Sequence, residues 1–245
     1  MLKNDILKIL EKYQGTYGVF VKSNSEIVKI NVDEIFPSAS LIKLFILLAI
    51  NNSNLDNKIK IDKKDIVAGE GALGKLSGNL TLSVRDLATL MIILSDNMAT
   101  NILIDYLSMD YINNIIRENG FKSTILQRKM LDFKAAKEGR ENYTSPRDVY
   151  QVLKLLYKNS LFLNMLKNQH LNNKISLYLS ENEDFIFAHK TGELKNIEHD
   201  AGRLFYKDKF IDIVVMSKNL HSNGDGIKVH NEIGELLIKM LLKNN

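Results

Sequence analysis

The spacing of apolar residues changes along this 245-residue chain, and that change constrains the fold more than any other feature. Residues 16–22 and 27–32 follow strand-like patterns, and so does the chain after residue 182. From about residue 40 to residue 159 the signals are helical. A sheet must therefore be assembled from the two ends of the chain. The sequence predicts one α/β domain over 1–245, in which 1–37 and 175–245 form a discontinuous α/β lobe and 38–174 forms an inserted all-helical lobe.

Individual elements can be placed within these two lobes. A first helix carries apolar residues from Leu2 to Tyr13, and an amphipathic helix over 227–242 closes the chain. The five strands are predicted at 16–22, 27–32, 185–189, 202–206 and 210–216. In the helical lobe, helices are predicted from about Ser40 onward and at 84–91, 98–107 and 146–157.

Composition excludes several classes of function. The chain has no cysteine, and its five histidines show no ligand spacing, so we expect no metal and no cofactor. The 33 basic and 29 acidic residues are interleaved and leave a formal charge of only +4, which argues against a nucleic-acid partner. The longest apolar run, residues 44–50, is too short to span a membrane. We expect a monomer that acts on a small molecule.

The first residues bear on the cellular location. Residues 1–7 are too polar for the hydrophobic segment of a secretory signal, and they lack a small-residue cleavage site. As written, the sequence predicts a cytoplasmic protein, and an exported protein whose signal has been removed is the alternative.

Lys43 has the most informative surroundings of any charged residue. It lies in Ser40-Leu-Ile-Lys-Leu-Phe-Ile-Leu-Leu-Ala-Ile, which predicts a helix buried on all sides. Burial of an ammonium is costly and lowers its pKa, and the i, i+3 spacing puts Lys43 beside the hydroxyl of Ser40. A hydroxyl next to an amine that can take its proton is the arrangement of a serine nucleophile. The alternative is that Ser40 caps the helix and Lys43 extends to solvent.

Two further polar triplets follow along the chain. Ser95-Asp96-Asn97 separates two predicted helices, so helix capping is its simplest interpretation. Lys190-Thr191-Gly192 ends a predicted strand, where a basic residue beside a hydroxyl suits a carboxylate ligand and a glycine allows a ligand's backbone to approach. A charged edge strand ending in a turn is the alternative for this second triplet.

In this order, Ser40-x-x-Lys43, Ser95-Asp96-Asn97 and Lys190-Thr191-Gly192 resemble the signature of the class A β-lactamases, which are penicillin-recognising serine hydrolases. The resemblance extends over nearly the whole chain. It implies a β-lactamase-like α/β (α+β) fold, with an antiparallel five-stranded sheet flanked by the terminal helices. A catalytic cleft is expected between the sheet and the inserted all-α lobe.

The resemblance also implies catalytic roles. Ser40 would be acylated, Lys43 would activate it, and Ser95 would relay a proton toward the leaving nitrogen. Asn97 would bind the substrate's amide carbonyl and contact Lys43, while Asp96 would brace the loop.

Substrate-binding roles follow in the same way. Lys190 and Thr191 would bind the substrate's carboxylate, with Gly192 beside them. The backbone N–H groups of Ser40 and Glu193 would form the oxyanion hole. Arg203, on the next strand, is a candidate second anchor for the carboxylate, and a plain surface arginine is the alternative.

The chain departs from the family at the residue that activates the deacylating water. The family carries a glutamate there, in a Glu-x-x-Leu-Asn string on an Ω-shaped loop, and the corresponding stretch over 126–146 contains no such string. Aligning on Arg128 puts Met130 at this position, and aligning on Pro146 puts Lys129 there.

Other acidic residues near this loop could take the glutamate's place. Asp132 is the nearest catalytic candidate, followed by Glu138 and Glu141, and loop bracing or solvated charge is the alternative for all three. Arg128 is expected to close the neck of the loop with Asn142 or Asp132.

The sequence therefore predicts a serine hydrolase that is acylated at Ser40 by β-lactams or related amides and esters and hydrolyses the β-lactam ring. Fast deacylation is not assured without the glutamate, so Lys43 would have to act as the acylation base. A DD-peptidase-like or esterase-like hydrolase with slow deacylation is one alternative. A non-catalytic penicillin-binding sensor is the other.

Overall fold

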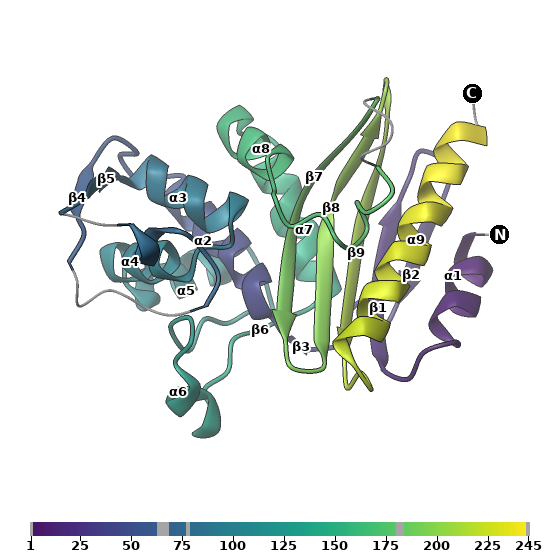
Figure 1. Cartoon of the computed structure of the whole chain (residues 1–245), viewed down its shortest axis with the longest axis horizontal. Coiled ribbons are helices and arrows are strands. Elements are labelled where there is room, and N and C mark those ends of the chain that lie inside the picture. The colour runs from purple at the N-terminus through teal and green to yellow at the C-terminus, as the bar shows by residue number, and fades with distance from the viewer. Residues whose placement is uncertain (1, 63–68, 77–78, 180–183, 244–245) are drawn as a thin grey trace.

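The computed structural model describes residues 2–62, 69–76, 79–179 and 184–243. Its main sheet is antiparallel and has the strand order β2-β1-β9-β8-β7. The strands are β1 (Thr16–Lys22), β2 (Ile27–Ile30), β7 (Phe185–Leu194), β8 (Ile197–Tyr206) and β9 (Lys209–Lys218). Because β1 pairs with β9 along its whole length, the two ends of the chain form one sheet (Figure 1). The predicted fold class is confirmed.

Each face of this sheet has its own hydrophobic core. One face packs against the terminal helices α1 (Leu2–Leu10) and α9 (Asn223–Lys243), and the other against α7 (Pro146–Leu156) and α8 (Ser160–Lys167) (Figure 1). Side chains alternate between faces along a strand, so Ile213 and Val215 join the core of the terminal helices while Val214 joins that of the helical lobe. The helical lobe thus shares a core with the sheet.

The three C-terminal strands are longer than the sequence predicts, with ten residues each. Lys190-Thr191-Gly192 consequently lies inside β7, opposite 199–201 of β8, and does not end the strand. The added residues include buried polar side chains such as Glu198 and Asp200, which bond to other buried groups. These polar positions interrupt the apolar alternation that identifies a half-buried strand.

The helical lobe is built around α2 (Ile42–Ile50), which follows a single 3₁₀ turn, η1 (Ala39–Leu41). Every residue of α2 except Leu48 is buried. Four helices pack around it: α3 (Val84–Ile93), α4 (Asn97–Leu107), α5 (Met109–Glu118) and α7. Connecting segments carry η3 (Leu73–Lys75), α6 (Phe133–Lys137) and two small unpredicted sheets, β3 (Phe36–Pro37) with β6 (Tyr143–Thr144) and β4 (Lys58–Lys60) with β5 (Thr81–Ser83).

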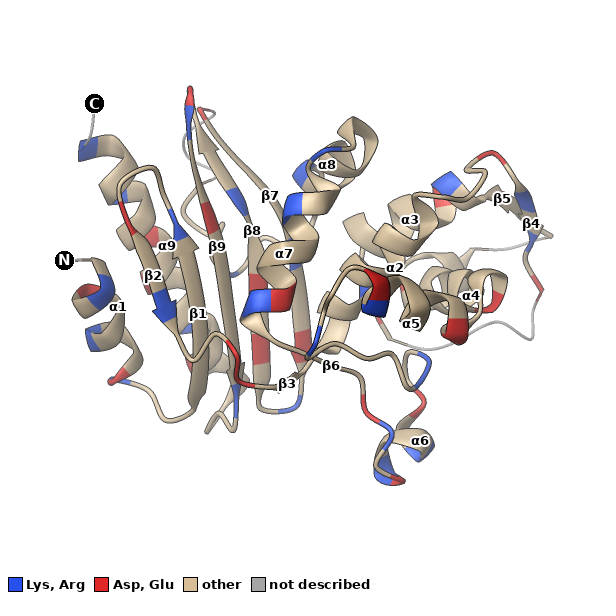
Figure 2. Ribbon diagram, turned by 180° about the vertical axis from the view of Figure 1, so that it is seen from behind, with Lys and Arg blue, Asp and Glu red and all other residues tan. Residues whose placement is uncertain are grey.

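Charged residues are distributed over both lobes. Lysine and arginine are interspersed with aspartate and glutamate along the ribbon (Figure 2), in keeping with the small net charge of +4. Within the four described ranges, no helix is long and apolar enough to cross a membrane.

Candidate active site

A cleft of about 330 Å³ lies where β7 meets the helical lobe. Residues from all three triplets line it: Ser40, Ser95, Thr191 and Gly192. The remaining wall is formed by Glu70, Glu193 and residues 170–174. Because β7 and η1 are in direct contact, Ser40 and the strand that carries Lys190 meet in this cleft.

Ser40 lies in η1, two residues before α2 begins. Its neighbour Ala39 has a φ of 46°, in the left-handed region that costs a residue with a Cβ about 1 kcal/mol or more. Gly192 packs so closely here that an added Cβ would lie 3.3 Å from the backbone nitrogen of Ser40. The Ser40 side chain is half-buried, and among the described residues its hydroxyl has no hydrogen-bond partner. The hydroxyl therefore remains available at the wall of the cleft.

The ammonium of Lys43 is fully buried and points at the second triplet. Its Nζ donates to the carbonyl oxygen of Ser95 at 2.6 Å, to Asn97 Oδ1 at 2.9 Å and to Ser95 Oγ at 3.1 Å. In the described part of the chain, no carboxylate pairs with it. Burial lowers the pKa of the Lys43 ammonium to about 7, against the opposing effect of the Asp96 and Glu70 carboxylates. The predicted contact between Asn97 and Lys43 is present.

Lys190 approaches the same hydroxyl from the sheet. Its Nζ donates to Ser95 Oγ at 3.0 Å and to the carbonyl oxygen of Thr191 at 2.9 Å. Burial holds the pKa of the Lys190 ammonium well below its usual value, and the positive charges of Lys43 and Lys174 lower it further. Ser95 Oγ thus lies between two buried amines, and this links the three triplets through one oxygen atom.

Asp96 holds the loop that carries Ser95. Its Oδ1 accepts from the N–H of Ala99 at 2.9 Å and caps α4, and its Oδ2 accepts from the N–H groups of Ala72 and Leu73 at 2.7 Å each. Ser95 itself has a φ of 53°. The capping and the site geometry are therefore compatible, because Asp96 supplies the cap while Ser95 and Asn97 face Lys43.

Two predicted site residues are not brought to this cleft. Arg203 pairs with Asp212 on β9, at 2.6 Å and 3.0 Å, and its guanidinium lies over the rings of Tyr157 and Phe210. Its charge is thus neutralised between β8, β9 and α7, and it does not line the cleft. Asp132 is exposed and caps α6 by accepting from the N–H of Ala135 at 3.0 Å.

The neck of the loop closes through Asn142. Its Oδ1 accepts from the backbone N–H of Arg128 at 3.0 Å, and its Nδ2 donates to the carbonyl oxygen of Arg128 at 3.0 Å. The guanidinium of Arg128 pairs with Glu141 at 2.7 Å. Asn142 therefore has the bracing role that the sequence offered to either Asn142 or Asp132.

Met130 and Lys129, the two candidates for the position of the missing glutamate, lie in different surroundings. Asn101, one turn along α4 from Asn97, bonds to the backbone of Met130 at both N (2.8 Å) and O (3.2 Å). Met130 is buried against this helix. Lys129 pairs with Asp105 at the surface. Of the two candidates for the position of the family's glutamate, Met130 is thus the one held against the helix that carries Asn97.

Sequence reasoning gave no catalytic or binding role to two charged residues of the cleft wall, Glu70 and Lys174. Glu70 is part of a glycine-rich segment that gave no catalytic pattern, and its backbone carbonyl accepts from the N–H of Asn97 at 3.0 Å. Lys174 follows a run of polar residues in a loop, where no periodicity marks a buried cation.

Comparison with known proteins identifies the family. The model of the β-lactamase enzyme family matches residues 1–241. The chain belongs to this family. A β-lactamase from Phocaeicola vulgatus is 28% identical over 220 residues, which cover 78% of this chain and 67% of the relative. The resemblance to class A β-lactamases is therefore confirmed.

Solved structures support the same fold. A β-lactamase from Sphaerobacter thermophilus superimposes with a TM-score of 0.85 at 26% identity and covers 98% of this chain and 96% of its own. PBP-A has the same TM-score at 23% identity, with 99% and 96% covered. A point mutant of PBP-A has been solved as an acyl-enzyme complex with penicillin G.

Proposed function

We propose that this chain is a serine hydrolase that is acylated at Ser40 by β-lactams and then releases the opened product. The observation that carries the proposal is the environment of Lys43. A buried amine with a pKa of about 7 and no carboxylate partner in the described residues can exist as the free base at neutral pH. It lies three residues from the Ser40 hydroxyl, which is available in the cleft, and this i, i+3 spacing supports a role for Lys43 as the base that activates Ser40.

Acylation would use the amine of Lys43 and the hydroxyls of Ser40 and Ser95. The Oγ of Ser40 attacks the β-lactam carbonyl carbon, and its proton passes to the Nζ of Lys43. The carbon–nitrogen bond then breaks, and the leaving nitrogen takes the proton of Ser95 Oγ. Lys43 Nζ, 3.1 Å from Ser95 Oγ, returns a proton to that oxygen and becomes neutral again.

Substrate binding would rest on β7 and the start of α2. The backbone N–H groups of Ser40 and Glu193 would stabilise the oxyanion, and the close approach of Gly192 to Ser40 supports this pairing. Lys190 and Thr191 would bind the substrate's carboxylate. Arg203 has no part in this proposal, because its guanidinium is already paired with Asp212.

A second candidate is an acylating enzyme that deacylates slowly, in the manner of a DD-peptidase or esterase. Met130 favours it, since a thioether cannot take a proton from water. The likeness to PBP-A, seen as an acyl-enzyme with penicillin G in its mutant form, is consistent with either candidate.

Intact-mass spectrometry after mixing with a penicillin separates these possibilities. We expect a covalent adduct on the wild-type chain and none on Ser40→Ala. An adduct that decays, with nitrocefin turnover, supports β-lactam hydrolysis, whereas an adduct that persists for hours supports the second candidate. A wild-type chain that forms no adduct would refute acylation altogether and leave a non-catalytic binding domain.

A further inference from the structure

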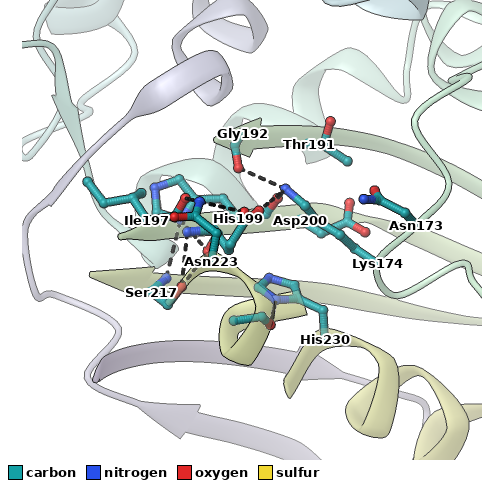
Figure 3. Close-up of polar contacts among 12 residues, drawn as sticks. Asn173, Lys174, Thr191, Gly192, Ile197, His199, Asp200, Ser217, Asn223 and His230 are labelled. Atoms are coloured by element: carbon teal, nitrogen blue, oxygen red, sulfur yellow. Dashed lines mark hydrogen bonds and ion pairs between the residues drawn. The ribbon is translucent and has the colours of Figure 1, made fainter. Parts of the chain in front are cut away.

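Lys174 is a third buried lysine beside the cleft, and it has no role in the chemistry described above. Its side chain is 2% exposed, although the residue lies in a loop. Its Nζ pairs with Glu198 Oε2 at 2.5 Å and donates to the carbonyl oxygens of Gly192 at 2.9 Å and His199 at 3.2 Å. Figure 3 shows this amine directed at the Gly192 carbonyl on β7. One carboxylate oxygen and two carbonyl oxygens thus surround the ammonium, and Lys174 is engaged within the protein.

The Gly192 carbonyl belongs to a particular peptide group. The plane that carries this C=O also carries the N–H of Glu193, which is the proposed second donor of the oxyanion hole. All described peptide bonds are trans, so the carbonyl and the N–H point in opposite directions. Fixing the oxygen on Lys174 therefore fixes the N–H on the other side. An ammonium on a carbonyl oxygen also polarises the amide and makes its N–H a stronger donor.

We infer that Lys174 is a positioning residue for the oxyanion hole, acting through the Gly192–Glu193 peptide. The inference rests on the proposed acylation at Ser40 and goes beyond it by assigning this peptide a dedicated cation. Since an oxyanion-hole donor acts mainly in the transition state, Lys174 affects the acylation rate constant more than the binding of substrate.

A second set of contacts keeps Lys174 in place. Glu198 is fully buried, and its Oε1 accepts from Asn223 Nδ2 at 2.7 Å. The Nδ2 of Asn223 also donates to the Leu194 carbonyl at 2.8 Å, and its Oδ1 accepts from the N–H of Asn196 at 2.8 Å. The start of α9 and the β7–β8 hairpin are thus tied to the carboxylate that holds the ammonium. These contacts hold the carboxylate of Glu198 in place, and the carboxylate in turn keeps the Lys174 ammonium against the Gly192 carbonyl.

The chain also contains a control that separates the stability provided by a buried ion pair from the effect of Lys174 on the oxyanion hole. Arg203 and Asp212 form another cation–carboxylate pair on β8 and β9, with Asp212 only 4% exposed, but neither lines the cleft. Loss of either pair should destabilise the fold, because it leaves a carboxylate largely buried without a partner. Only the loss of the Lys174 contact should change the Glu193 N–H.

The test compares Lys174→Met with Arg203→Met by stopped-flow acylation with a fluorescent penicillin. We expect the acylation rate constant of Lys174→Met to fall about 10- to 100-fold, somewhat less than the loss of a whole oxyanion donor, with substrate binding changed less than about three-fold. Arg203→Met should lose thermal stability and keep its acylation rate constant within about two-fold. Glu198→Asp is the second variant. It keeps the charges of Lys174 and of its carboxylate partner, so it should fold even if Lys174→Met does not. The shorter side chain draws the ammonium away from Gly192, which should slow acylation about three- to ten-fold.

The outcomes distinguish this inference from the proposed function. A wild-type chain that forms no adduct overturns both. Normal acylation by Lys174→Met, or by Glu198→Asp if the first variant does not fold, overturns the role of Lys174 alone. Weaker substrate binding with an unchanged rate constant would do the same, because it would make Lys174 a binding residue.

Discussion

The pH dependence of acylation tests the role of Lys43 most directly. If Lys43 is the base, only its neutral form can accept the proton of Ser40. With a pKa of about 7, the neutral fraction is about 0.09 at pH 6 and about 0.91 at pH 8, so the acylation rate constant should rise about ten-fold between them. Lys190 shares Ser95 Oγ with Lys43, so the measured midpoint is a property of the pair. Stopped-flow measurements with a fluorescent penicillin give the profile.

Two exposed carboxylates on the wall of the cleft provide a matched comparison. Glu70 raises the pKa of Lys43, whereas Glu193 is not among the groups that act on it. Glu70→Gln removes a negative charge that favours the ammonium form of Lys43. The rising limb of the profile, over which the acylation rate constant increases with pH, should therefore move to lower pH. Glu193→Gln should leave the limb in place. A midpoint below about pH 5 in the wild-type chain would refute the reasoning, since it would indicate a carboxylate base.

Three further substitutions test other parts of the site, and Gly120→Ala serves as a control outside it. Met130→Glu should shorten the lifetime of the acyl-enzyme about 100-fold or more in time-resolved mass spectra, because it restores a carboxylate that can take a proton from water. Asp96→Asn should lower the free energy of unfolding by about 2–4 kcal/mol in urea titrations, since its carboxylate accepts from three backbone N–H groups. Gly71→Ala should cost at least about 2 kcal/mol in the same assay, because Gly71 has a φ of 116° and its added Cβ would overlap the Asp96 carboxylate. Gly120→Ala, at a φ of 77° with no atom within 4 Å, should cost only about 1 kcal/mol.

The features that local sequence could predict are those that depend on spacing along the chain. The Ser40–Lys43 spacing and the apolar run around it placed an amine in a buried helix, and α2 has that burial. The strand over Thr16–Lys22 was predicted at its observed limits because its apolar residues face two cores. Both inferences needed only neighbours within a few residues.

The features that it could not predict depend on partners far away in the sequence. Arg203 is removed from the cleft by Asp212, which lies opposite it on the next strand, and a sequence motif carries no record of that register. Lys174 is buried only because Glu198 and the carbonyls of β7 and β8 surround it. Asp132 resembled a catalytic carboxylate from its position near Met130, but its own loop uses it to cap α6.

The substitution at the position of the family's glutamate links the two halves of the proposed reaction. Met130 is held one turn of α4 from Asn97, whose Oδ1 bonds to Lys43. A carboxylate at this point would activate water, but its charge would also favour the ammonium and raise the pKa of Lys43. In the proposed reaction, its absence would slow deacylation and, at the same time, keep Lys43 neutral enough to start acylation. Met130→Glu should consequently shift the rising limb of the acylation profile to higher pH while it shortens the life of the acyl-enzyme. A variant that deacylates faster with an unshifted limb would show that the two effects are independent.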